Sequence, residues 1–287
     1  MQQTIRGTLP LGYPVLVIAL ILLTAAVRDG AAAGLMNADT ITAPFRDAVY
    51  NHSLDESEAG RMYRSTLAQI NAADLSQSET ERGRALTAYY LGRYHQAVKS
   101  REEMASYAGN LRKGHYLALR KYYTERNAAL EAYRIARGAA EKYLELEPGA
   151  PSHSLLGEIL GQMLFLGNAP QALSIGPKAR REVKKALELD PDCRKALIQE
   201  ASRLAYSPPA YGGNPGEARN LYRRILRNGT ENKENEFNIY GGFAMAAFME
   251  KNDEQALSWF NEALRIYPGN VFALGMSDYL REALLDR

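Results

Sequence analysis

Cysteine and tryptophan are scarce in this sequence of 287 residues, which contains one of each, Cys193 and Trp259. A single cysteine excludes a disulfide within the chain, and it says little about compartment because exported bacterial proteins often lack disulfides. Neither positive nor negative charge dominates, since the formal net charge is +2 and basic and acidic residues are interspersed. The charge pattern therefore indicates no nucleic-acid partner.

Signatures of catalytic and metal sites are missing as well. The four histidines stand more than four residues from one another and from the cysteine, so none has the local spacing of metal ligands. No Gly-x-Ser-x-Gly elbow occurs. Cys193 follows Pro191-Asp192 at a predicted helix start, where a thiolate is favoured, but no other motif accompanies it. We therefore expect no enzyme activity, no metal and no cofactor.

The first 33 residues have the pattern of a secretory signal. Arg6 supplies a positive start, residues 15–27 are apolar apart from Thr24, and three alanines ending at Ala33 provide an Ala-x-Ala site. This pattern predicts cleavage after Ala33 and a periplasmic or secreted protein. The alternative is an inner-membrane anchor formed by residues 11–27, a length near the lower limit for a span. Membrane contact is expected only if that segment is uncleaved.

Beyond the signal, apolar residues recur at helical spacing, and several polar residues stand where helices are expected to begin. Asp55, followed three residues later by Glu58, predicts a capping box. Ser76 or Ser78 is expected to cap the next helix.

Two long helices are predicted over residues 100–146, the second from about residue 124, and a final helix is predicted from residue 271 onward. With 46% hydrophobic and 24% charged residues, the composition is typical of a folded chain.

Residues 237–270 form the clearest unit of the chain. One predicted helix places aromatic and small residues on a single face, and a second does the same after a break at residues 251–253. The two stripes are Tyr240, Phe243, Ala244 and Ala247, and then Ala256, Phe260 and Ala263. Small residues let two antiparallel helices approach closely, while the aromatic rings fill the remaining space. Pro268 ends the second helix. The order and the 34-residue length resemble the tetratricopeptide repeat (TPR), a helix–turn–helix unit.

The same ending recurs at Pro148, Pro191 and Pro268. These prolines are separated by one and by two repeat lengths, each with nine additional residues. We expect the additional residues in turns, around residues 167–178, 207–214 and 228–236, because insertions in solenoids map to loops. Residues 92–97 loosely resemble a TPR turn, so the N-terminal part is repeat-like.

Residues 207–218 are the most distinctive local feature. Their prolines and glycines exclude a helix, and Gly212 and Gly213 permit positive φ angles. Asn214 and Pro215 then predict an N-cap followed by proline at the first helical position. A similar Pro-x-x-Gly-Gly-Asp/Asn turn occurs in exported bacterial TPR proteins, so the resemblance extends to that type. The loop either only redirects the chain, with Tyr211 against its own repeat, or contributes to binding.

The resemblance implies an all-α fold, a TPR-like solenoid. Its expected parts are a signal peptide (1–33), a repeat-like N-terminal helical region (34–123), TPR-like repeats (124–270) and a C-terminal capping helix (271–287). It also implies a non-enzymatic scaffold in the cell envelope, with a protein or peptide partner in its concave groove. A weaker similarity is to the T-component of TRAP transport systems, a TPR-like partner of a solute-binding protein. A small-ligand-binding helical protein with a tyrosine-lined cavity is the other alternative, prompted by eighteen tyrosines.

In TPR proteins the first helix of each repeat lines the groove. Carried onto residues 237–270, this resemblance implies four partner-binding candidates, and four more lie at or beside the loop after residue 206. The candidates are Tyr206, Tyr211, Gly212, Gly213, Asn238, Met245, Phe248 and Met249. The last three predict an apolar patch for a helix or an extended peptide. The alternative is that the C-terminal helix covers this patch.

Overall fold

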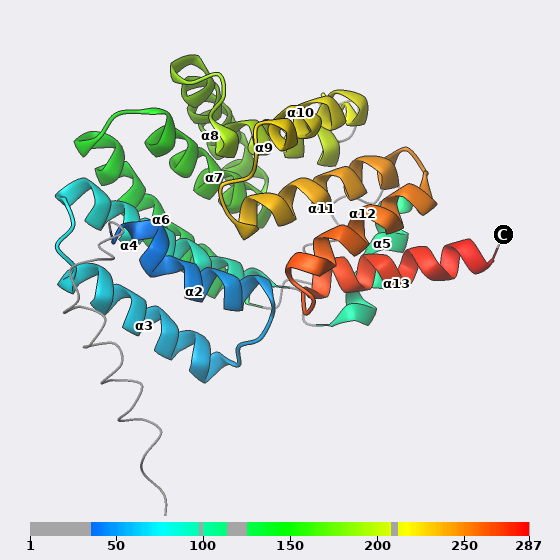
Figure 1. Ribbon diagram of the computed structural model, residues 1–287, viewed down its shortest axis with the longest axis horizontal. Helices are drawn as coiled ribbons and strands as arrows, with labels where there is room; N and C mark the ends of the chain where they lie inside the picture. The colour runs from blue at the N-terminus through cyan, green and yellow to red at the C-terminus, as the bar shows by residue number, and fades with distance from the viewer. Residues whose placement is uncertain (1–35, 98–99, 114–124, 208–211, 287) are drawn as a thin grey trace, which may run out of the picture. The chain divides into compact units, whose positions relative to one another are not determined.

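The computed structural model describes residues 36–97, 100–113, 125–207 and 212–286 (Figure 1). All regular elements in these ranges are helices, so the expected all-α class is confirmed. The helices are Ala38–Tyr50 (α2), Glu56–Ala72 (α3), Gln77–Gln96 (α4), Arg101–Arg112 (α5), Arg126–Leu146 (α6), Ala150–Leu166 (α7), Ala169–Leu189 (α8), Arg194–Tyr206 (α9), Pro215–Arg227 (α10), Lys233–Met249 (α11), Asp253–Ile266 (α12) and Val271–Leu285 (α13).

The described residues from Asn37 onward belong to one compact unit. The signal-like segment lies outside the described residues. Among the described helices, none combines the length and the apolar character needed to cross a bilayer.

Helix boundaries follow local capping chemistry. The Asp55 carboxylate accepts a hydrogen bond from the Glu58 N–H at 2.8 Å, and the Glu58 carboxylate accepts one from the Asp55 N–H at 2.9 Å. Ser76, rather than Ser78, caps α4. Asn214 caps α10 with Pro215 as the first helical residue, as the sequence predicts.

Consecutive helices pack in pairs, α7 with α8, α9 with α10 and α11 with α12. Small residues allow close approach at several helix contacts. A Cβ atom on Gly157 of α7 would lie 2.9 Å from a Val183 methyl of α8. Ala256 and Ala263 of α12 are fully buried. Gly242 of α11 packs so closely on Tyr222 of α10 that a Cβ atom would fall 2.1 Å from the ring.

Two predicted breaks are wrong. The segment expected to form a turn at residues 92–97 continues α4 through Gln96, and Gly92 is needed there because the Tyr133 ring of α6 lies against its Cα. The insertion expected as a loop around residues 167–178 lies mostly in α8, which contains Pro177. Because Pro177 has no N–H group, the helical hydrogen bond to the carbonyl of Leu173, four residues earlier, is not formed. Leu173 is 80% exposed, so water can satisfy that carbonyl.

The N-terminal helices contact the C-terminal end of the chain. The side chain of Asn270, which caps α13, donates to the Tyr50 carbonyl at the end of α2 at 2.7 Å. The Tyr267 hydroxyl donates to Asp47 of α2 at 2.7 Å. Helix α5 packs on α13, where Arg101 forms two hydrogen bonds with the Asp278 carboxylate, at 2.9 and 2.8 Å.

Candidate functional site

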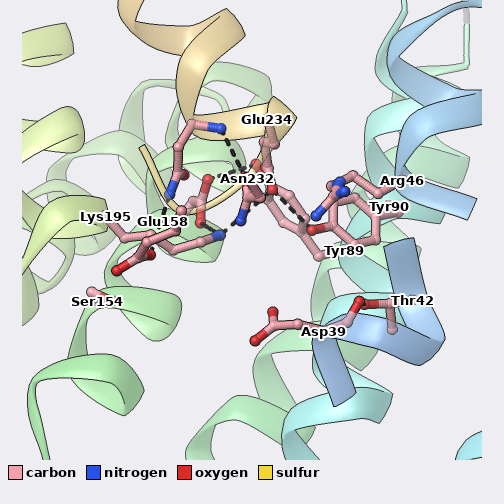
Figure 2. A network of polar contacts seen from close by, with 12 residues as sticks. Asp39, Thr42, Arg46, Tyr89, Tyr90, Ser154, Glu158, Lys195, Asn232 and Glu234 are labelled. Atoms are coloured by element: carbon pink, nitrogen blue, oxygen red, sulfur yellow. Dashed lines mark hydrogen bonds and ion pairs between the residues drawn. The ribbon is translucent and has the colours of Figure 1, made fainter. Parts of the chain in front are cut away.

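A network of buried charged and phenolic side chains joins the N-terminal helices to the first helices of the three pairs. Figure 2 shows much of this network. Its central members are Tyr50 of α2, Tyr89 and Tyr90 of α4, Glu158 of α7, Lys195 of α9 and Glu234 of α11. We call these six residues the central network.

Glu234 is the most deeply buried acid of the central network, with 1% of its surface exposed. One carboxylate oxygen accepts a hydrogen bond from the Tyr50 hydroxyl, and the other accepts one from the Tyr90 hydroxyl, both at 2.9 Å. Glu234 stands in the first turn of α11, which begins after the N-cap Asn232. The positive end of the helix dipole therefore adds to the stabilisation of this carboxylate.

Lys195 connects the two acids. Its ammonium group donates to Glu158 at 3.2 Å and lies 3.7 Å from Glu234. The second oxygen of Glu158 accepts a hydrogen bond from the Tyr89 hydroxyl at 2.9 Å. The carboxylate oxygens of both acids thus have donors, as buried polar groups require.

The pKa values of the lysine and of the tyrosines are raised above their ordinary values. Burial lowers the pKa of Lys195, but the Glu158 and Glu234 carboxylates outweigh that effect and raise it above the ordinary value. Burial, together with the carboxylate of Glu234, raises the pKa of Tyr50 and Tyr90 well above 10. Lysine therefore stays charged and the phenols stay neutral donors. General acid–base catalysis requires the opposite, a pKa near the working pH.

Arginines and amides surround the central network. Arg93 donates to Gln162 of α7 at 3.0 Å, and its guanidinium carbon lies 5.6 Å from the centre of the Tyr50 ring. Asn238, a predicted groove residue, is half-buried on α11, four residues after Glu234.

The predicted apolar patch on α11 is covered in the described structure. Met245 and Phe248 are each 1% exposed, and Met249 is half-buried. The Arg112 guanidinium of α5 lies 3.9 Å from the centre of the Phe248 ring, and Tyr279 of α13 contacts the same ring edge-on. The geometry therefore corresponds to the alternative in which the C-terminal helix, here with α5, covers the patch.

The remaining predicted residues lie at the end of α9 and in the loop after it. Tyr206 is half-buried at the last residue of α9. Gly212 has a φ of +83°, the left-handed conformation that its lack of a side chain permits, and its carbonyl accepts a hydrogen bond from Arg203 at 3.3 Å. Gly213 is half-buried, and Tyr211 lies outside the described residues.

The acids and the lysine of the central network were not singled out from the sequence. One signal was available, because Glu158 is the only acidic residue of the mostly apolar helix α7. An acid within such a helix requires a buried partner. The partner, Lys195, stands 37 residues further along the chain, and no local pattern connects the two residues.

Cys193 and His153, whose residue types can serve in catalysis or metal binding, have structural partners here. Burial raises the pKa of Cys193, whose thiol contacts the Ala150 carbonyl, so the protonated thiol is favoured. His153 bonds to Glu182 at 2.7 Å. Within the described residues, no group of three or more histidine, cysteine or acidic side chains has the arrangement of a metal site.

No protein-family model matches the sequence, and no curated protein matches it.

Proposed function

We propose that this chain is a non-enzymatic interaction protein of the TPR type, which stacks helix pairs in series and binds a protein or peptide partner in the cell envelope. The order of helix contacts supports the proposal, because α9 packs on its own partner α10 and also contacts α7 and α11. Helical repeats bury their cores in this way, each pair being covered by the next.

The partner surface lies away from the central network, whose side chains are already bonded to α2 and α4. Tyr206, Tyr240 and Trp259 are half-buried and pack over one core cluster formed by α9, α10 and α11. Trp259 stacks on Phe243 and Tyr240, with ring centres 4.7 and 5.9 Å apart. This aromatic cluster carries the proposal, because half-exposed tyrosine and tryptophan held rigidly are typical anchors of protein interfaces.

A capture experiment with the full chain tests this function. The expected result is a protein from an envelope extract bound in a fixed ratio, with retention reduced at least about tenfold by the double variant Y240A/W259A. The matched control is L285S, which removes an exposed leucine (86%) at the C-terminal end of α13, outside the aromatic cluster. Equal retention by the wild type and Y240A/W259A would contradict the proposed surface.

Two alternatives give different results in the same experiment. A solute-binding protein as the captured partner would favour the accessory role in TRAP-type transport. A chain that captures no protein but retains a small molecule, detected by native mass spectrometry, would favour a ligand-binding protein. The tyrosine-rich central network motivates the hypothesis of a ligand-binding protein, although its polar groups already bond to one another.

A further inference from the structure

Helix α8 carries several basic side chains on its exposed face. Along the linear sequence this is not apparent, because basic and acidic residues are interspersed. Its inner side is buried through Ala179 and Ala186. Five cationic side chains are exposed on the remainder of the helix: Lys178, Arg180, Arg181, Lys184 and Lys185. The exposed fractions of Arg181 and Lys184 reach 70% and 77%.

Acidic residues neutralise this face only partly. Glu182 is 12% exposed and turned toward His153 of α7, although Arg181 approaches it at 3.6 Å. Glu188 lies 3.7 Å from both Lys184 and Lys185, at the C-terminal end of the helix. Five cations with one exposed acid leave a strongly positive surface along a helix of 21 residues.

Apolar side chains are exposed at the N-terminal end of the same helix. Leu173 of α8 is 80% exposed and Phe165 of α7 is 52% exposed. Both lie near the point where α7 meets α8, because Leu164 packs within 3.8 Å of a Cβ position on Gly176. Leu173 precedes Gly176 by one helical turn, and Phe165 follows Leu164 directly.

We propose that the exposed face of α8, with Leu173 and Phe165 at its N-terminal end, binds the surface of an anionic lipid bilayer. The cations match the negative charge of lipid headgroups, and the two apolar side chains can enter the boundary between headgroups and acyl chains. A nucleic acid would also attract the cations, but its phosphate backbone offers no apolar environment for an exposed leucine. This inference does not depend on the proposed partner surface.

Vesicle binding by the full chain tests the proposal. The probes are vesicles of phosphatidylcholine with about one third phosphatidylglycerol, and vesicles of phosphatidylcholine alone. The α8 variant is R181Q/K184Q/K185Q, and the matched control is R134Q/R265Q/R281Q, which removes three exposed arginines that also have acidic neighbours three residues away. All these proteins keep the same N-terminal segment, so a difference between them reports on the substituted face.

We expect the α8 variant to bind the anionic vesicles about 100-fold more weakly than the wild type, since each surface charge contributes about a fivefold change. The control should stay within about twofold. The separate variant L173Q should weaken binding about tenfold. Added salt should reduce wild-type binding, and circular dichroism should be unchanged in every variant.

Three results would overturn the proposal. The first is equal binding of anionic vesicles by the wild type and the α8 variant. The second is equal binding of the wild type to the two kinds of vesicle. The third is binding of duplex DNA, but not of anionic vesicles, that is lost in the α8 variant, which would make the same face a nucleic-acid surface.

Discussion

At the residue scale, Lys195 shows how much of the interior depends on one charge. Replacement of Lys195 by methionine leaves Glu158 and Glu234 without their shared cation. Loss of one partner from a buried ion pair costs about 3–5 kcal/mol, and the one-fifth exposure of the Lys195 side chain reduces the expected loss to about 2–4 kcal/mol.

Urea unfolding of K195M measures this loss. The control K142M removes an exposed lysine of α6 and should change the free energy of unfolding by less than about 0.5 kcal/mol. Equal stability of the two variants would show that the buried acids do not need the lysine.

His52 should make the free energy of unfolding depend on pH, in a direction that follows from its pKa shift. Burial lowers its pKa below 6.5, so the unfolded chain takes up a proton there at a higher pH than the folded chain. The free energy of unfolding should therefore decrease as the pH falls below 6.5, until the lower pKa of the folded state is reached.

The variant H52N tests this assignment. His52 has a φ of 50°, which asparagine also tolerates, so the backbone is preserved. Unfolding measured across this pH range should give a shallower decrease for H52N than for the wild type. Parallel curves would assign the slope to other groups.

At the scale of elements, two neighbouring glycines of α11 separate helix propensity from packing. A Cβ atom on Gly242 would fall 2.1 Å from the buried Tyr222 ring, so G242A should lose about 2 kcal/mol or more of stability. A Cβ atom on Gly241 meets no atom within 4 Å, so G241A should gain up to about 1 kcal/mol from helix propensity.

Thermal unfolding of the two alanine variants provides the measurement, and each variant serves as the control of the other. Melting temperatures that shift in the same direction would contradict the close packing of α10 against α11.

Helix boundaries could be predicted where the determining contacts are local. The capping box of Asp55 with Glu58, and Asn214 before Pro215, depend on residues at most three positions apart. The helical positions of Gly92 and Pro177 could not be predicted from local sequence, because they depend on surrounding parts of the structure. A ring from another helix requires the glycine, and an exposed surface tolerates the proline.

At the scale of the whole molecule, the sequence indicated the class of fold and the helix pairs but not the contacts between distant parts. The Tyr50 hydroxyl reaches Glu234 across 184 residues. Arg112 of α5 covers Phe248, which the resemblance to TPR proteins implied for a groove. Periodicity identifies the apolar face of a helix, whereas the occupant of that face depends on the path of the whole chain.

The central claim is that the N-terminal helices are bonded to the first helices of the pairs through the central network. A double-mutant cycle between Tyr90 and Glu234 tests it, with the variants Y90F and E234Q and their combination. The hydrogen bond of 2.9 Å to a buried carboxylate predicts a coupling energy of about 1–2 kcal/mol. A control cycle of Y90F with E254Q, an exposed acid of α12, should be additive within about 0.5 kcal/mol. Additivity of Y90F with E234Q to the same degree would contradict the account.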